Sequence, residues 1–343
     1  MRRRGITVLV GAVLVAALTV LVGRATVPYV ELEPGPTYDT LGVDENGKEV
    51  IVVTGASTSK SAGQLRFVTV GVQPRLTLVE AILGWWRDDD AVVPRELIYP
   101  PDQTQEQVEK QNAEDFANSQ SAAEAAALTA LEYPVRVTVK AVTPGAPAAA
   151  VLKPGDVITS VDGVKVTSGE KLLELIRAKP VGTELTVGIT RAGKPQSVKI
   201  KTVATDDGKP RIGIEPAVSS TAPFKLEIPI DNIGGPSAGL MLALGIIDKL
   251  KPEDLTGGKI IAGTGTIDSA GNVGPIGGVP QKLVGAKDAG ATYFLTPKDN
   301  CAEAVANAPQ GLTLVQVGSL DEALAALGDV RAGRQPKVCP GAA

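Results

Sequence analysis

Ser237 is the residue of this chain whose surroundings best suit a nucleophile. It lies in the string G-G-P-S-A-G at residues 234–239, ahead of an apolar run, 240–250, that predicts a buried helix. The glycines permit a sharp turn, and the free amides at the helix start can hold an oxyanion. Gly235, Pro236 and Ala238 are expected to support the serine. The same string also fits an ordinary helix start after a turn, so a second motif is needed.

Lys282 provides the second motif. It follows the glycine-rich stretch 274–281 and falls on an early turn of a helix predicted between Pro280, which suits a first helical turn, and Gly290, which suits a C-terminal cap. Apolar neighbours would exclude water from the amine. Burial lowers the pKa of a lysine and makes its neutral amine available as a general base. An arbitrary lysine would instead be solvated on an exposed helix face.

The composition narrows the chemistry further. The chain contains no histidine, which excludes a Ser-His-Asp triad, a Cys-His pair and a histidine-ligated zinc. A side-chain nucleophile must therefore use a lysine, a carboxylate or a terminal amine as its base. The net charge of −4 gives no basic footprint, so nucleic-acid binding is not expected. No metal site and no cofactor are predicted.

The first residues predict a membrane anchor. Three arginines, 2–4, precede an uncharged apolar run at 6–22, and no small-residue cleavage site follows it. We therefore expect residues 1–24 to form a cytoplasmic tip and an uncleaved single-pass transmembrane helix in the cell membrane, with the remainder extracytoplasmic. A cleaved signal peptide and a buried helix are the alternatives. In such an oxidising compartment Cys301 and Cys339 are predicted to form a disulfide.

Residues 25–132 are predicted to form a β/α region. Strands are expected at 49–53 and 65–72, a helix near 78–86, and a long helix over 102–131, which lacks proline and glycine. No catalytic constellation occurs here, so we expect a structural or spacer role. The adjacent Trp85 and Trp86 suit a membrane or partner surface, although core packing is the interpretation that we favour.

Residues 133–205 carry several signals in a recognisable order. Val135, Val137 and Val139 alternate as in a strand, P-G-A-P-A-A follows at 144–149, then L-K-P-G-D-V-I at 152–158 and an Asp-Gly turn at 162–163. This stretch resembles a bacterial PDZ domain. The resemblance implies binding of an extended peptide by strand addition at a sheet edge.

The peptide contacts implied for this PDZ-like domain come from one strand and one helix. They are Val135, Val137, Leu172 and Ile176. The glycine loop that cradles a carboxylate is missing before residue 135, which leaves open whether C-termini or internal segments bind. The polar segment 206–210 is short, so we expect the PDZ-like domain to pass captured segments to Ser237.

The stretch from about 212 to 328 resembles the proteolytic domain of Lon proteases. In that family a P-S-A-G serine and a G-G-x-x-x-K lysine form a Ser-Lys dyad, and here 45 residues separate Ser237 from Lys282. The resemblance implies that Thr264 hydrogen-bonds the lysine and that the chain forms a homo-oligomer, with a hexamer as the form common in the family. Gly234 stands where the family often has Asp, and Thr266 where it has Glu.

Together these patterns predict an α+β multidomain protein with a transmembrane helix, a β-rich N-terminal region, a PDZ-like domain and a Lon-type α/β protease domain at 206–343. The chain has no G-x-x-x-x-G-K-[ST] loop, so we expect ATP-independent endopeptidase activity on unfolded, flexible or membrane-proximal proteins. The alternative is a catalytically inactive scaffold or adaptor of a membrane complex.

Overall fold

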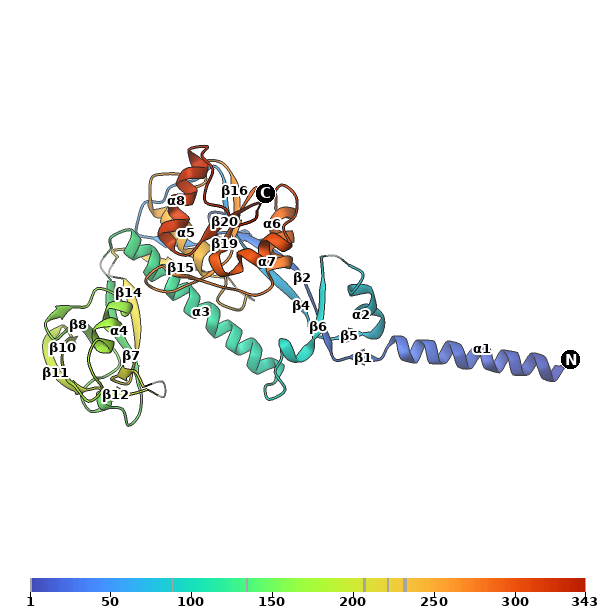
Figure 1. The fold of residues 1–343 in the computed structure, drawn as a ribbon, viewed down its shortest axis with the longest axis horizontal. Helices are drawn as coiled ribbons and strands as arrows, with labels where there is room; N and C mark the ends of the chain where they lie inside the picture. Colours follow the sequence, from blue (N-terminus) through green and yellow to red (C-terminus); the bar gives the residue numbers. More distant parts are fainter. Residues whose placement is uncertain are drawn as a thin grey trace.

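The computed structural model describes residues 2–87, 89–133, 135–205, 208–220, 222–230 and 233–342. Three parts are visible in Figure 1: a larger α/β domain, a small β-rich module beside it, and an N-terminal helix that extends away from both. The larger domain contains the predicted catalytic residues Ser237 and Lys282 and is called the catalytic domain below. The segment 206–210, for which a tethering role was expected, lies partly outside the described residues, since Asp206 and Asp207 are not among them.

The catalytic domain is built on a mixed sheet of six strands in the order β20-β19-β16-β4-β2-β6. β4, β16, β19 and β20 run parallel, and β2 and β6 are antiparallel to their neighbours. The strands, in chain order, are β2 (Tyr29–Asp39), β4 (Gln64–Gln73), β6 (Ala91–Pro94), β16 (Ile260–Gly263), β19 (Tyr293–Pro297) and β20 (Thr313–Val317). Val, Ile, Leu and Phe dominate their buried positions, as expected for strands covered on both faces.

Helices cover both faces of this sheet. On one face lie α3 (Gln105–Ala130), α5 (Gly239–Leu250) and α8 (Leu320–Arg331), which share one apolar core with β4. On the other lie α6 (Val279–Asp288) and α7 (Cys301–Ala306). α5 is apolar around its circumference and buried from Gly239 to Lys249, in agreement with its sequence. A disulfide joins Cys301 to Cys339 and ties the C-terminal tail to α7.

The N-terminal region is part of this domain, which corrects the expected boundaries. β2, β4 and β6 come from residues 25–132, yet they hydrogen-bond into the same sheet as β16, β19 and β20. The long helix predicted for 102–131 is α3, and it packs on α5. Of the structural or spacer role expected for this region, the structural one is therefore observed, and the expected start of the protease domain at residue 206 is wrong. The reason is that the pairing of β4 with β16 joins strands that are far apart in the sequence.

The small module has its own sheet in the order β11-β10-β8-β7-β14, with β9 beside β8. A helix, α4 (Gly169–Arg177), packs on this sheet over a separate apolar core. The strands are β7 (Val135–Val142), β8 (Val157–Val161), β9 (Val164–Lys165), β10 (Glu184–Arg191), β11 (Lys194–Lys201) and β14 (Ile214–Ser220). Because β14 belongs to the sheet, the module extends to residue 220 and not to 205 as expected.

The module is inserted into the catalytic domain. Its first strand follows α3, and its last strand, β14, leads back to β15 (Lys225–Glu227), which pairs with β3 (Val52–Thr54) of the catalytic domain. The rings of Tyr133 and Phe224, one on each connection, meet edge to face at 5.2 Å between centroids. The two connections therefore lie side by side.

The N-terminal part comprises α1 (Arg2–Gly23) and α2 (Leu78–Gly84). No helix in the described ranges has both the length and the apolar character needed to cross a membrane, so the predicted transmembrane helix is not supported. Trp85 is 56% exposed and Trp86 is 84% exposed, so the core packing that we favoured for this pair is wrong.

The remaining elements are short. They are the strands β1 (Thr26–Val27), β5 (Leu76–Thr77), β12 (Val203–Ala204), β13 (Pro210–Arg211), β17 (Thr266–Ile267) and β18 (Val273–Gly274), and the 3₁₀ turns Arg95–Leu97, Pro147–Ala150 and Lys298–Asn300.

Candidate active site

Ser237 lies in the turn directly before α5, two residues ahead of the first residue of the helix. Its carbonyl oxygen accepts hydrogen bonds from the amide of Gly265 at 2.8 Å and from Oγ1 of Thr264 at 3.1 Å. Both donors directly follow β16, whose last residue is Gly263. The end of a central strand thus fixes the backbone of Ser237.

The structure brings Ser237, Lys282 and Thr264 together. Nζ of Lys282 lies 2.9 Å from Oγ of Ser237 and 3.3 Å from Oγ1 of Thr264. Lys282 is on the first turn of α6, whose cap, Gly278, has a φ of +68° that favours glycine. A Cβ on Gly278 would also lie 2.6 Å from Cγ2 of Val70. The glycine-rich loop therefore lets α6 begin close enough to β4 for the lysine to reach the serine.

The amine of Lys282 is largely removed from solvent. The side chain is buried, and this burial lowers the pKa of Lys282 from its ordinary value of 10.5 to about 8. Desolvation acts in this direction because it disfavours the charged form of an amine. A substantial fraction of Lys282 is therefore neutral near pH 8, and the neutral amine can accept the hydroxyl proton of Ser237 over the 2.9 Å that separates them.

Helix α3 holds the loop that carries the serine. The amide of Gly235 donates to the carbonyl of Asn112 at 2.8 Å, and Oγ of Ser119 donates to the carbonyl of Pro236 at 2.9 Å. Gly235 has a φ of +83°, a conformation that suits glycine. Sequence reasoning missed Asn112 and Ser119. The polar Ser119 on the buried face of an otherwise alanine-rich segment was the available signal.

Two backbone amides beside the nucleophile can bind an oxyanion. Within the described ranges, the amides of Ser237 and Ala238 form no hydrogen bond to a backbone carbonyl, in contrast to those of Gly235 and Leu240. They lie at the N-terminal end of α5, where the helix dipole favours negative charge. Asp231 and Asn232, which begin this stretch, lie outside the described residues.

A cleft with a volume of about 910 Å³ opens onto Ser237 and Lys282. One wall is β4 beyond Phe67, where the pairing with β16 has ended, from Val68 to Val72. Leu97, Ile98 and Val108, which precede or belong to α3, also line the cleft. Thr266, which stands where Lon proteases often have Glu, also lines the cleft. An extended chain with apolar side chains fits this lining.

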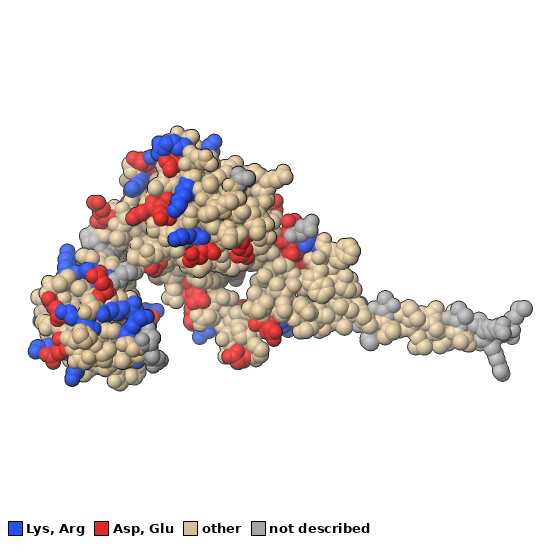
Figure 2. Space-filling view, viewed as in Figure 1, with Lys and Arg blue, Asp and Glu red and all other residues tan. Residues whose placement is uncertain are grey.

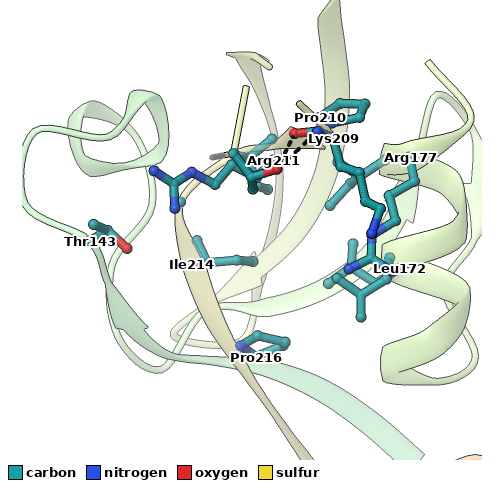
Figure 3. Close-up of a pocket in the computed structure, with 13 residues that line it drawn as sticks. Thr143, Leu172, Arg177, Lys209, Pro210, Arg211, Ile214 and Pro216 are labelled. Atoms are coloured by element: carbon teal, nitrogen blue, oxygen red, sulfur yellow. Dashed lines mark hydrogen bonds between the residues drawn. The ribbon is translucent and has the colours of Figure 1, made fainter. Parts of the chain in front are cut away.

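A second opening, of about 140 Å³, lies on the module between α4 and β14 (Figure 3). Its apolar lining includes Leu172 and Ile176 from α4 and Ile214 from β14. Three basic residues border it: Arg177 is the last residue of α4, and Lys209 and Arg211 precede β14. We call this opening the α4–β14 groove.

This groove corrects the predicted peptide contacts. β7 is paired on both sides, by β8 and β14, and Val137 is 1% exposed in the core of the module, so the strand of Val135 and Val137 is not at a sheet edge. Nothing is described of the side chain of Val135. Leu172 and Ile176 do line the groove, but they face β14. Pro216 was the missed signal, because a proline inside a strand favours an edge position.

The comparisons with known proteins also find two domains, although the matched ranges differ from the bounds that the structure shows. Residues 107–202 match the family model of the PDZ domain. Residues 195–327 match that of the Lon protease (S16) C-terminal proteolytic domain. The chain thus combines a PDZ domain with a Lon-type proteolytic domain.

Relatives of the second part are Lon proteases. Lon protease 1 of Bacillus subtilis (strain 168) is 32% identical over 118 residues, which are 33% of this chain and 15% of that protein. Lon protease 2 of Herpetosiphon aurantiacus is 35% identical over 119 residues, 33% of this chain and 14% of that protein. The chain therefore spans only 14 to 15% of the length of these two relatives.

Among solved structures, the PDZ domain of the SdrC-like protein from Listeria monocytogenes is similar to this chain at 33% identity. The match covers 23% of this chain and 85% of that chain, with a TM-score of 0.23.

Proposed function

We propose that this chain is a serine endopeptidase in which Ser237 is the nucleophile and Lys282 the general base. The observation that carries the proposal is the 2.9 Å approach of a buried lysine amine to the hydroxyl of a serine at a helix start. The match to the Lon proteolytic domain supports serine peptidase chemistry at this position.

In the proposed reaction, neutral Lys282 takes the proton of Ser237 as Oγ attacks a peptide carbonyl. The amides of Ser237 and Ala238 hold the oxyanion of the tetrahedral intermediate. Protonated Lys282 then gives its proton to the leaving amine, and a water molecule, activated by the same lysine, releases the acyl group. Thr264 positions the lysine through its hydroxyl.

Ser237→Ala tests the nucleophile. We expect cleavage of a reporter peptide to fall by about three orders of magnitude or more, since only binding and oxyanion contacts would remain. The thermal transition should be preserved, because the hydroxyl is small and lies at the edge of a cleft. A peptidase rate that survives in this variant would show that another residue is the nucleophile.

A serine-directed phosphonate separates this enzyme from an inactive scaffold. An activated Ser237 is labelled covalently, whereas an ordinary serine hydroxyl does not react at a measurable rate. Mass spectrometry should locate the label on the peptide that contains Ser237, and Lys282→Arg should prevent labelling because a guanidinium stays protonated. An unlabelled wild-type chain would favour the scaffold.

We further propose that the α4–β14 groove captures an extended segment of the substrate. The outer edge of β14 has no strand partner in the described sheet, and apolar side chains of α4 stand opposite it. Such an edge accepts a peptide strand through its backbone. The basic residues at one end favour a segment that finishes in a carboxylate, which can be tested by comparing free and amidated C-termini.

Substrates, energy use and assembly complete the proposal. The cleft suits unfolded or flexible chains, and we propose cleavage without ATP, so addition of ATP should leave the rate unchanged.

We also propose a homo-oligomer, with a hexameric ring as the form that the Lon resemblance implies. Sedimentation of the full chain would measure its mass, and a monomer at micromolar concentration would refute assembly.

The cellular location is a separate proposal. We propose an extracytoplasmic catalytic domain held at the membrane by α1, supported by the arginines before an apolar run and by the Cys301–Cys339 disulfide, which is typical of oxidising compartments. Extraction of membranes with carbonate and protease treatment of intact cells test attachment and sidedness. A soluble, protease-protected chain would contradict both.

A further inference from the structure

The helix α2 has its large apolar side chains on the outside. Its buried positions are Ala81 and Gly84. A Cβ on Gly84 would lie 2.5 Å from Oε1 of Glu31 and 2.6 Å from Cγ2 of Val92, so α2 sits too close to the sheet for a larger residue there. An amphipathic helix of a soluble domain buries its large residues and exposes its small or polar ones. α2 shows the reverse pattern.

The outward side of α2 and the turn after it form one apolar surface, which we call the α2 face. Its residues, with their exposed fractions, are Val79 48%, Ile82 44%, Leu83 52%, Trp85 56% and Trp86 84%. Single exposed apolar residues are common on proteins, whereas five on one short segment mark a site of interaction.

The α2 face continues the apolar surface of α1. Leu9 is 67% exposed and Leu14 is 64% exposed on α1. At the end of α1, a Cβ on Gly23 would lie 3.6 Å from Cγ2 of Val79, and the pairing of β1 with β5 ties the two helices together. Figure 2 shows few charged side chains over the described part of α1 and the neighbouring lobe.

The two tryptophans suit the boundary between water and lipid. A tryptophan combines a large apolar ring with one N–H donor and is enriched where one end of a side chain is apolar and the other wet. The ring of Trp85 is held edge-on against Tyr29, with 5.7 Å between centroids. Arg24, which is exposed, follows α1 at the same end and can meet an anionic headgroup.

We propose that the α2 face lies in the headgroup region of a lipid bilayer, beside α1. A protein partner that covered α2 alone would leave the adjoining apolar surface of α1 in water, whereas a bilayer covers both. For this proposal it is sufficient that α1 and α2 lie against the membrane surface, and α1 does not have to span the bilayer. Because α2 packs on β2 and β6, the catalytic sheet would be held at the membrane directly.

Intrinsic fluorescence tests this proposal because the chain contains only two tryptophans, both in the α2 face. The full chain is mixed with vesicles of equal parts phosphatidylcholine and phosphatidylglycerol. We expect the emission maximum to move to shorter wavelength, and lipids brominated near the headgroup to quench more strongly than lipids brominated near the acyl end. Emission unchanged by vesicles would overturn the proposal.

Two variants separate the α2 face from α1. Ile82→Ser combined with Leu83→Ser should lose most of the quenching while α1 is intact. Val181→Ser, which alters a 47% exposed valine on the PDZ module, should retain all of it. Equal quenching in both variants would contradict docking by α2. If the emission maximum shifts with protein concentration in the absence of lipid, the α2 face is covered by a second copy of the chain instead of a bilayer.

Discussion

The catalytic cleft and the α4–β14 groove are both bordered by a strand edge and a helix, yet their polar groups are arranged differently. In the cleft, Lys282 and Thr264 are buried and hydrogen-bonded to Ser237. In the groove, Arg177 and Arg211 are exposed to solvent. A change in the cleft should therefore have a large effect on chemistry, and a change in the groove a small effect on capture, since solvent screens exposed charges.

Replacement of Lys282 by Met should give the largest effect. Activity should fall by about three orders of magnitude because the base is lost. Stability at pH 7 should rise, because the pKa of Lys282 is lowered from 10.5 to about 8 and the folded state must carry a buried charge below that pH. The gain is at most about 3 kcal/mol, less the hydrogen bonds that the amine makes.

The pH dependence of stability shows in which direction the titration of Lys282 acts. Between pH 8 and 10.5 the unfolded chain binds more protons than the folded one, so wild-type stability rises with pH across this window. Lys282→Met should lose this rise, and urea unfolding at several pH values measures it. Lys287→Met, on the exposed side of the same helix, is the control and should change neither quantity. If the Lys282→Met variant is less stable than the wild type, burial of the charged amine does not destabilise the folded protein.

The pH profile of the wild type should show a smaller effect, about tenfold for each pH unit. kcat/KM for a peptide without titrating groups should rise up to about pH 8, where Lys282 becomes neutral, and then level off. The chain has no histidine to impose a transition near pH 6.5. A profile that is flat from pH 6 to 9 would argue against Lys282 as the base.

Ser119→Ala tests whether α3 positions the nucleophile. Its loss removes the 2.9 Å hydrogen bond to the carbonyl of Pro236, so kcat should fall by about tenfold and stability by about 1 kcal/mol, with KM nearly unchanged. Ser121→Ala is the matched control, because that hydroxyl bonds to Ala117 within the same helix. If the two variants behave alike, Ser119 has no positioning role.

Reversal of charge in the groove should have the smallest effect. Arg177→Glu with Arg211→Glu should raise KM for a protein substrate roughly fivefold, the size expected for exposed charges. Cleavage of a short reporter peptide should stay the same. Lys194→Glu with Lys201→Glu changes the same charge on the far strand β11 and should do nothing. A reporter peptide affected as strongly as the protein would show that the groove does not act in capture.

The contrast between the catalytic cleft and the α4–β14 groove also explains which of the two sites could be predicted from the sequence. The sequence could predict that Ser237, Lys282 and Thr264 lie together, because the proposed chemistry requires those residue types in glycine-rich surroundings. The structure places the three within hydrogen-bonding distance. The groove was placed on the wrong strand, because alternation in β7 reports burial but not which neighbour lies beside it. Strand order depends on pairing between β7 and β14, which alternation alone does not encode, and Pro216 indicates only that β14 favours an edge.

The domain boundaries predicted from the sequence were wrong for a related reason. β4 pairs with β16, with Gln64 opposite Ile260 at a separation of 196 positions in the sequence, and the carbonyl of Asn112 accepts a hydrogen bond from the amide of Gly235. Composition along 25–132 contains no sign of either contact. The disulfide was easier to anticipate, since the chain has only two cysteines.

The edge-to-face contact of Tyr133 with Phe224 places the entry and exit of the PDZ module beside each other. A short linker can close such a gap at little cost in chain entropy, and a foreign domain with neighbouring termini can occupy it. We therefore expect that the module can be exchanged for another domain. If the proposed role of the module in capture holds, such an exchange would change the choice of substrate, while the serine and the lysine stay where the surrounding sheet holds them.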